Sequence, residues 1–502
     1  MFLRTGQYPS KSTVGLEPGR WKMLNLAWVS FFLTFVVWYN LGAFSTTIAR
    51  VLHLTREQSQ VLLLCNLALT IPARVAVGML VDRFGPRRIY SGLLALACLP
   101  CLGIAFSNHF WQLAICRLLI SCVGAGFVVG IRMVGEWFDA REIGTAEGIY
   151  GGLGNFGMAA ATFGLPLLAL LFNPATGWRW ATAISGLMCL AWSFIFYAKA
   201  VDAPPGKEFK RPKKKGALEV TSRPDLAALV LLQVPMVLCL GVTAWRLVRV
   251  HFVPVSISYV VYGLLAALLF QQVRKILIVN RSIAAGEIVA GEDRYSFSQV
   301  AILCLCYAVT FGGELAVEQM LPAYFEKMFG VSVAIAGVMG AGFAFANFVA
   351  RPLGGILGDH VGRKPIMVVT LAGSALGFFL IPMIGPKWPL WGAMGLVMVV
   401  GLFLMAGNGA NFCIAPLIRK PLTGQIAGLI GAYGSVGSVA FMTIFLLTNT
   451  LTFFMAMGVC GLVAFVCCFM IREPGRITTT IDKRTLESLV PAAVPELAVG
   501  LA

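Results

Sequence analysis

The stretch Thr70–Arg88, TIPARVAVGMLVDRFGPRR, places an arginine inside an apolar segment and follows that segment with a charged turn. The chain repeats this arrangement in Asn347–Lys364, which reads NFVARPLGGILGDHVGRK. Matched residues lie 277 positions apart: Arg74 and Arg351, Gly78 and Gly355, Asp82 and Asp359, and Gly85 and Gly362. A motif that recurs at one spacing indicates a duplicated structural unit. The two equivalent arginines therefore predict a paired site where two related halves meet.

The composition is that of an integral membrane protein. Of the 502 residues, 58% are hydrophobic and 12% are charged, and the mean hydropathy is +0.83. About a dozen apolar windows are long enough to cross a hydrocarbon core of roughly 30 Å as helices. These windows lack the period-two alternation of membrane β-barrel strands. We therefore expect an all-α fold in a lipid bilayer, with no role in nucleic-acid binding despite the net charge of +17.

Hydropathy predicts two pseudo-symmetric bundles of six spans each. The first-half spans are expected near residues 25–47, 58–81, 88–107, 109–135, 145–171 and 179–199, and the second-half spans near 298–324, 332–357, 365–385, 389–417, 424–447 and 451–471. The predicted organisation is an N-terminal segment (1–24), a first bundle (25–200), a central linker (201–297), a second bundle (298–471) and a polar tail (472–502). The spans thus number 12 in the core.

The central linker contains two further apolar segments, at 225–245 and 252–270. An inserted membrane hairpin would preserve the orientation of the second half and raise the total to 14 spans. The competing interpretation is an interfacial or re-entrant pair, because Arg246 and Arg249 would otherwise face the outside. No protein partner of this insertion can be named from its sequence.

Basic residues cluster between particular spans, and such loops stay on the cytoplasmic side of a membrane. They precede the first span, follow the second at Arg83, Arg87 and Arg88, and fill the segment 207–215. Both termini are therefore expected in the cytoplasm.

Most of the 13 cysteines lie in apolar runs, where a thiol behaves as a small hydrophobic group, so we expect no metal site. The sequence has no GxxxxGK[ST] phosphate-binding loop, which argues against ATP hydrolysis, and no cofactor is expected.

A second duplication lies in two glycine-rich spans. The first reads GTAEGIYGGLGNFG at residues 144–157 and the second GQIAGLIGAYGSVG at residues 424–437. Glycines three or four residues apart form a smooth helical stripe along which another backbone can approach closely. The residues predicted to pack in this way include Gly151, Gly154, Gly157, Gly431, Gly434 and Gly437.

Arg74 and Arg351 are the residues on which the functional prediction depends. An arginine in hydrocarbon is costly, so it normally faces a cavity and finds a counter-charge. A structural ion pair is the alternative explanation, but deep acids are scarce and consist chiefly of Glu314 and Glu318. The guanidinium fork suits a planar oxyanion because it offers two parallel donors. The pair therefore predicts a site for a small anion.

Polar and aromatic residues near the arginines could line such a site or serve as core packing. An amide or phenol can donate to an oxyanion, and the edge of an aromatic ring carries partial positive charge. The candidates are Asn155, Asn408, Asn411, Phe127, Tyr307 and Phe311.

Several of these motifs resemble those of a known family. GMLVDRFGPRR and GGILGDHVGRK resemble the paired loop motif of the major facilitator superfamily, and GGLGNFG and GAYGSVG resemble the glycine-rich signatures of its nitrate/nitrite porter family. FGGELAVEQMLPAYF is similar to the high-affinity nitrate transporters of cyanobacteria, algae, fungi and plants. The resemblance implies that Arg74 and Arg351 clamp the anion, and that Tyr307, Phe311, Phe127 and Asn155 lie around it.

The resemblance further implies a secondary transporter rather than an enzyme. It favours import of nitrate, with nitrite as a second substrate, across the cell membrane by proton symport; a nitrate/nitrite exchanger and a nitrate sensor are the alternatives. Glu314 is the candidate proton carrier, with Glu318 one turn outward, although either could instead be a counter-ion or a vestibule charge. Asp82, Arg83, Asp359 and Arg363 are expected to lock and release the halves during alternating access.

Overall fold

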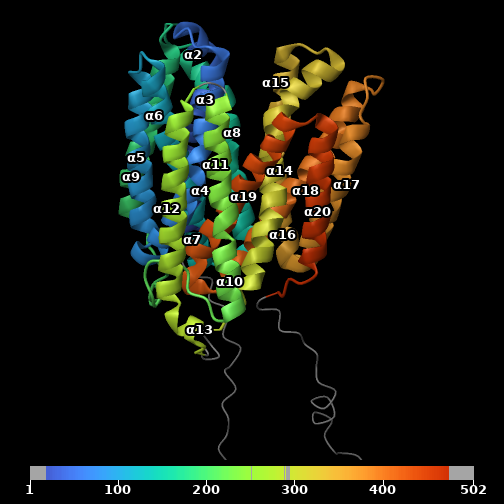
Figure 1. The fold of residues 1–502 in the computed structure, drawn as a ribbon. Coiled ribbons are helices and arrows are strands. Elements are labelled where there is room, and N and C mark those ends of the chain that lie inside the picture. Colours follow the sequence, from blue (N-terminus) through green and yellow to red (C-terminus); the bar gives the residue numbers. More distant parts are fainter. Residues whose placement is uncertain (1–18, 174, 250–251, 288, 290–293, 474–502) are drawn as a thin grey trace, which may run out of the picture.

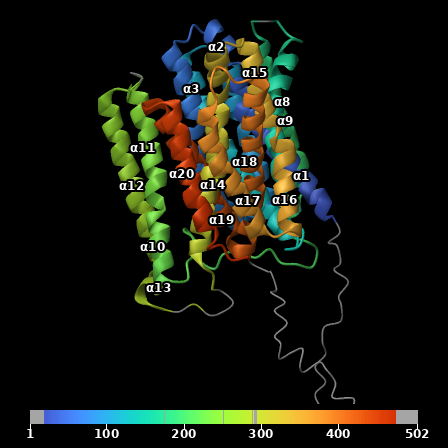
Figure 2. The same ribbon diagram turned by 90° about the vertical axis from the view of Figure 1, so that its right-hand side faces the viewer.

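The computed structural model describes residues 19–173, 175–249, 252–287, 289 and 294–473. Within these ranges the regular secondary structure is entirely helical, and the helices run roughly side by side (Figures 1 and 2). The prediction of an all-α, multi-pass membrane fold is confirmed.

Two bundles of helices follow each other along the chain. The first bundle consists of α1 (Arg20–Ala43), α2 (Ser45–Val51), α3 (Arg56–Ala68), α4 (Thr70–Phe84), α5 (Pro86–Ala105), α6 (Phe110–Ser121), the 3-10 turn η1 (Cys122–Ala125), α7 (Gly126–Trp137), α8 (Ile143–Ala169) and α9 (Gly177–Lys199). The second consists of α14 (Phe297–Phe329), α15 (Val333–Phe345), α16 (Asn347–His360), α17 (Arg363–Leu380), η3 (Ile381–Met383), α18 (Leu390–Ile418), η4 (Lys420–Leu422), α19 (Thr423–Leu447) and α20 (Thr450–Cys468).

In the part of the chain that the structure describes, twelve helices are long and apolar enough to cross a membrane. Ten of them belong to the two bundles and two to the central insertion. The second and eighth predicted spans are not among them, because each is divided into two shorter helices, α3–α4 and α15–α16.

The two divided spans break at equivalent places. Leu69 separates α3 from α4, and Ala346 separates α15 from α16, so the breaks lie 277 residues apart, like the duplicated motif. At the first break the Leu69 N–H donates to the Ser121 hydroxyl (3.2 Å), and the Thr70 hydroxyl donates to the Ser121 carbonyl (2.7 Å). Each paired arginine therefore lies on a separate half-helix, five residues beyond a break.

The central insertion forms α10 (Arg223–Leu231), α11 (Gln233–Arg249), α12 (Val255–Val279) and α13 (Arg281–Ala285). Figures 1 and 2 show α11 and α12 alongside the bundles. The α10–α11 segment contacts α19, because the Tyr433 hydroxyl donates to the Leu232 carbonyl (2.7 Å). Much of α12 is exposed and apolar, which suits contact with lipid tails. That this hairpin crosses the membrane stays a prediction.

The two bundles meet at one end of the molecule. In Figure 1 their ribbons lie close together near α10 and diverge toward α2 and α15. The two charged turns of the duplicated motif lie at the close end, which we call the motif end; the opposite end is the distal end. Gly85 (φ +86°) and Gly362 (φ +123°) form these turns, and such positive φ angles favour glycine. Pro86 directly follows Gly85 as the first residue of α5.

Candidate functional site

Arg74 reaches from the first bundle into the second. It lies on α4, and its residue is 1% exposed. Its guanidinium donates to the Gly124 carbonyl (3.3 Å) in η1, and across the interface to the Gly431 carbonyl (2.5 Å) and the Ser435 hydroxyl (3.2 Å) on α19. The guanidinium carbon is 5.2 Å from the centre of the Phe311 ring on α14.

Arg351 reaches in the opposite direction, from α16 toward the first bundle, and is also 1% exposed. Its Nη2 donates to the Tyr307 hydroxyl (3.0 Å), whereas its buried Nη1 has no hydrogen-bond partner. The guanidinium carbon is 5.2 Å from the ring centre of Phe127 on α7 and 5.9 Å from that of Phe311. Phe311 thus lies beside both guanidinium groups.

Neither Arg74 nor Arg351 forms an ion pair within the described ranges of the chain. Backbone carbonyls and hydroxyls satisfy part of their hydrogen-bonding capacity, but they leave two positive charges uncompensated in a buried place. A buried charge without a partner is costly, so such a charge normally binds a counter-charge. The alternative explanation from sequence, a structural ion pair with a nearby carboxylate, is therefore not favoured by these contacts.

Aromatic rings separate and surround the two arginines. Tyr307 and Phe311 are stacked with centroids 4.9 Å apart, and Phe127 from the other bundle lies parallel to Tyr307 at 6.5 Å. Phe412, on α18, meets Phe127 (4.7 Å) and Tyr307 (4.9 Å) edge to face. The structure therefore brings together the three predicted aromatic residues and adds Phe412, which directly follows the predicted Asn411.

The three predicted asparagines have different surroundings. Asn155 on α8 is buried, and its amide nitrogen has no hydrogen-bond partner. Asn411 donates to the Leu303 carbonyl (3.1 Å) and so connects α18 to α14. Asn408 donates to Glu314. Asn155 alone of the three thus keeps an uncommitted donor.

Glu314, on α14, is buried and accepts hydrogen bonds from two amides. One comes from Asn347 (2.5 Å) at the start of α16, and the other from Asn408 on α18. Two amide donors stabilise a carboxylate in its ionised form. Glu318, one turn farther along α14, is only partly buried. The assignment of proton transfer to these two acids stays a prediction.

Asp82 joins the two bundles at the motif end. Its carboxylate accepts the N–H groups of Gly424 (2.8 Å) and Gln425 (2.9 Å) at the start of α19. These are donors that a helix cannot satisfy internally, and the positive end of the helix dipole favours an anion there. Arg132 on α7 pairs with the same carboxylate at 2.9 Å. Arg83 is exposed and contacts the Phe84 ring instead.

Asp359 makes the corresponding contact from the second bundle. It accepts the N–H groups of Gly144 (3.0 Å) and Thr145 (2.6 Å) at the start of α8. Arg363 lies 3.5 Å from Asp359 and donates to the Ala140 carbonyl in the first bundle. Each acid therefore caps a glycine-rich helix of the opposite half.

The glycine-rich helices α8 and α19 face the arginines directly. A Cβ at Gly151 would lie 2.6 Å from Arg351 Nε, and one at Gly431 would lie 3.3 Å from Arg74 Cδ. Nearer the motif end, Gly78 approaches the Gly424 carbonyl. Other predicted glycines meet neighbouring side chains or backbone as follows: Gly154 meets Phe31, Gly157 the Phe32 carbonyl, Gly434 Tyr307 and Phe311, Gly437 the Ala308 carbonyl, and Gly355 the Gly144 carbonyl.

Glu147 is a buried acid near the site that the sequence does not predict to be functional. This residue lies on α8 between Gly144 and Gly151, is 2% exposed, and has no hydrogen-bond partner on either carboxylate oxygen. Its position inside the glycine-rich signature, GTAEGIYGGLGNFG, was the available signal, because an acid in that stretch is buried if the glycines pack.

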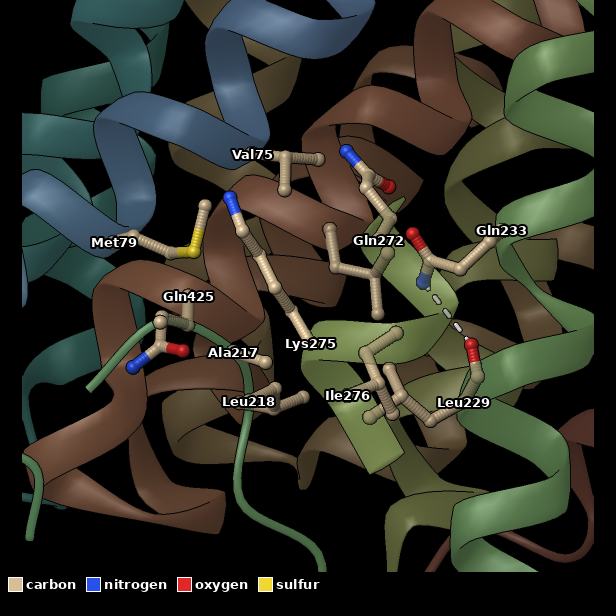
Figure 3. A pocket seen from close by; sticks show the side chains of 12 residues that line it. Val75, Met79, Ala217, Leu218, Leu229, Gln233, Gln272, Lys275, Ile276 and Gln425 are labelled. Atoms are coloured by element: carbon tan, nitrogen blue, oxygen red, sulfur yellow. Dashed lines mark hydrogen bonds between the residues drawn. The ribbon is translucent and has the colours of Figure 1, made fainter. Parts of the chain in front are cut away.

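A separate cavity of about 110 Å³ lies between the insertion and the bundles. Figure 3 shows Lys275 and Gln272 of α12 beside Gln233 of α11, which donates to the Leu229 carbonyl (3.0 Å). The remaining lining is Val75, Met79, Gly216, Ala217, Leu218, Ile276, Gln425 and Leu429. Neither paired arginine lines this cavity, so it is distinct from the arginine site.

Comparisons with known proteins show the family and the fold of the chain. The sequence profile of the Major Facilitator Superfamily matches residues 27–285 and 303–497. The chain is 45% identical over 464 residues to a nitrate/nitrite transporter, NrtP, of Nostoc punctiforme, covering 91% of this chain and 93% of the relative. It is 24% identical to nitrate transporter 2.1 of Chlamydomonas reinhardtii, covering 82% of this chain and 66% of the relative.

Among solved structures, a double tryptophan mutant of XylE has the same fold, with a TM-score of 0.65 at 15% identity. The match covers 90% of this chain and 95% of that one. The arrangement of two six-span halves, the duplicated motif and the similarity over nearly the whole length lead to one conclusion. The chain belongs to the major facilitator superfamily and, within it, to the nitrate/nitrite porters.

Proposed function

We propose that this protein imports nitrate, and nitrite as a second substrate, by alternating access coupled to protons. The similarity to the nitrate/nitrite transporter of Nostoc punctiforme supports this substrate. The basic loops at the motif end support a cytoplasmic position for that end and for both termini. The distal end then faces the outside of the cell membrane.

The observation that carries the proposal is the buried arginine pair. Arg74 and Arg351 come from opposite halves, contact the same Phe311 ring, and lack a carboxylate partner in the described residues. The free Nη1 of Arg351 and the free amide of Asn155 are donors that an oxyanion would satisfy. A nitrate bound between the guanidinium groups supplies the missing negative charge.

The contacts at the motif end support alternating access. Asp82 and Asp359 close that end by capping helices of the opposite half. Release of nitrate into the cytoplasm requires these hydrogen bonds to break, and return to the present state requires them to form again. The carboxylates therefore act as a reversible latch.

Energetics favour proton symport. Moving one anion inward against an inside-negative potential costs about 2.3 kcal/mol per 100 mV. Two or more protons per nitrate reverse the sign of the transported charge, so the potential then assists uptake. Glu314 and Glu318 are the acids that the sequence predicts to carry these protons.

The deciding experiment is nitrate uptake into proteoliposomes with pH and voltage set independently. We expect accumulation when the outside is acidic and stronger accumulation when the inside is negative. Uptake that ignores both gradients but requires internal nitrite would establish an exchanger instead. Nitrate binding without any uptake would establish a sensor.

A further inference from the structure

Glu147 is a buried acid that has no role in the predicted anion clamp (Arg74 and Arg351) or in the latch (Asp82 and Asp359). Both of its carboxylate oxygens are buried without a hydrogen-bond partner. An ionised carboxylate in such a place would lose its hydration without compensation, whereas the protonated form is far less costly to bury. Glu314 differs from Glu147 because its carboxylate accepts hydrogen bonds from two amides.

The position of Glu147 connects the arginine site to the motif end. One turn ahead on α8, Gly151 lies against the Arg351 side chain, and three residues behind, Gly144 donates its N–H to Asp359. Glu147 therefore lies on the motif-end side of Arg351, between the clamp and the latch. The guanidinium of Arg351 therefore lies within about one helical turn of Glu147, and the Arg351 Nη1 is itself unpartnered.

The other titratable groups near Glu147 are bound elsewhere. The Asp359 carboxylate receives two backbone N–H groups, and the Cys413 thiol of α18 donates to the Gly409 carbonyl (3.2 Å). The Tyr150 hydroxyl donates to the Phe127 carbonyl on α7 (3.0 Å).

The elements packed around α8 carry further titratable groups, none of which donates to Glu147. These are Arg20, Lys22 and Tyr39 on α1, Arg132 and Glu136 on α7, Arg179, Cys189, Tyr197 and Lys199 on α9, and His360 on α16. Arg132 pairs with Asp82 and Glu136, and Arg20 pairs with Glu142. Arg351 is therefore the cation available to an ionised Glu147.

We propose that Glu147 is a proton carrier that is coupled to the anion through Arg351, an inference that rests on the proposed nitrate transport. When Glu147 is protonated, Arg351 is free to bind nitrate. When Glu147 is ionised, its carboxylate competes with nitrate for the same guanidinium. Proton and anion then bind together and leave together.

The latch places the release of this proton on the cytoplasmic side. Breaking the contacts of Asp82 and Asp359 admits water to the motif end, where Glu147 lies. The Glu147 O–H bond breaks, its proton passes to water, and the carboxylate keeps the electron pair. The new charge attracts Arg351 and displaces nitrate, so Glu147 delivers one of the protons that enter the cytoplasm with each nitrate.

The test is the pH dependence of nitrate binding to the purified full-length protein. Above the pH at which Glu147 ionises, the wild-type dissociation constant should rise about tenfold per pH unit, because one proton must bind with each nitrate. In Glu147→Gln, which stays neutral, the constant should be independent of pH. Proton-driven accumulation by this variant should fall at least about tenfold, since 1.4 kcal/mol of lost coupling corresponds to that factor.

Glu326→Gln, an exposed substitution of the same chemistry at the end of α14, is the matched control and should keep the wild-type pH profile. An unchanged pH profile in Glu147→Gln would overturn the proposal. If that variant does not fold, proton uptake on adding nitrate to weakly buffered wild-type protein decides instead, and nitrate binding without proton uptake overturns the inference. Wild-type protein that binds no nitrate at any pH would overturn the proposed function itself.

Discussion

Arg351 presents two guanidinium nitrogens with different roles. Nη2 is held by the Tyr307 hydroxyl, which fixes the plane of the group, while Nη1 is left for a ligand. A planar group with one edge anchored is pre-organised for an oxyanion, so less side-chain entropy is lost on binding. Arg74 is anchored similarly by the Gly431 carbonyl.

Replacing Arg351 with lysine keeps the charge but removes the fork. We expect nitrate affinity to fall about tenfold to a hundredfold, because a hydrogen bond to a charged group contributes about 1.5–3 kcal/mol. Isothermal titration of the purified variant measures this loss. Arg83→Lys, at the exposed motif arginine, is the control and should bind as the wild type does. Undiminished affinity in Arg351→Lys would remove the clamp from the proposal.

The residues of the site differ in how well the sequence predicted them. Arg74 and Arg351 were found because duplication places them at one spacing, and a buried guanidinium is rare enough to be noticed. Arg132 and Glu147 were missed because their importance depends on neighbours from other helices. Arg132 pairs with Asp82 from α4, and Glu147 lies among glycines whose spacing predicts helix packing.

At the scale of elements, Asp82 links the loop motif to the start of α19. Asp82→Asn would replace one carboxylate oxygen with an N–H₂ group that faces backbone N–H donors and Arg132. We expect the maximal rate of uptake to fall more than the apparent affinity, because the latch is remote from the arginine pair. Initial rates of nitrate uptake over a range of concentrations separate the two quantities. A fall in affinity at an unchanged maximal rate would contradict the assignment.

Gly355 allows α16 and α8 to touch. A Cβ there would lie 2.1 Å from the Gly144 carbonyl oxygen, so Gly355→Ala should force the bundles apart at the motif end. Overpacking costs about 1–3 kcal/mol, and we expect a corresponding loss of the closed state. Mass spectrometry of thiol labelling detects this change, because Cys413 is buried beside Gly144.

The matched control for this substitution is Gly395→Ala on α18, where a Cβ would meet no atom within 4 Å. It should leave Cys413 as protected as in the wild type. Equal protection of Cys413 in Gly355→Ala would show that the close approach does not hold the motif end shut.

The breaks at Leu69 and Ala346 could not be read from the sequence. A hydropathy average shows one apolar run through each span, because the polar residue that follows each break, Thr70 or Asn347, lies between apolar neighbours. The break depends instead on a tertiary contact, such as the Ser121 hydroxyl that receives the Leu69 N–H. Periodicity and composition therefore predicted the spans but not their division into half-helices.

At the scale of the whole molecule, the insertion is the part whose membrane topology needs a direct test. If α11 and α12 form a spanning hairpin, Ser256→Cys at the start of α12 should react with a membrane-impermeant maleimide added outside intact cells. Lys215→Cys should react only after the membrane is opened. Both positions are exposed, and the wild type with its native cysteines sets the background. Labelling of Ser256→Cys only from the inside would indicate a re-entrant pair.

The equivalent positions of Arg74 and Arg351 bear on the direction of flux. Each arginine is carried by a half-helix that begins at the same point of its own repeat, so an anion can pass the two arginines in either direction. The structure of such a carrier does not by itself impose a direction on transport. Net movement then follows whichever electrochemical gradient is steeper, and vesicles loaded with nitrate at low internal pH should export it.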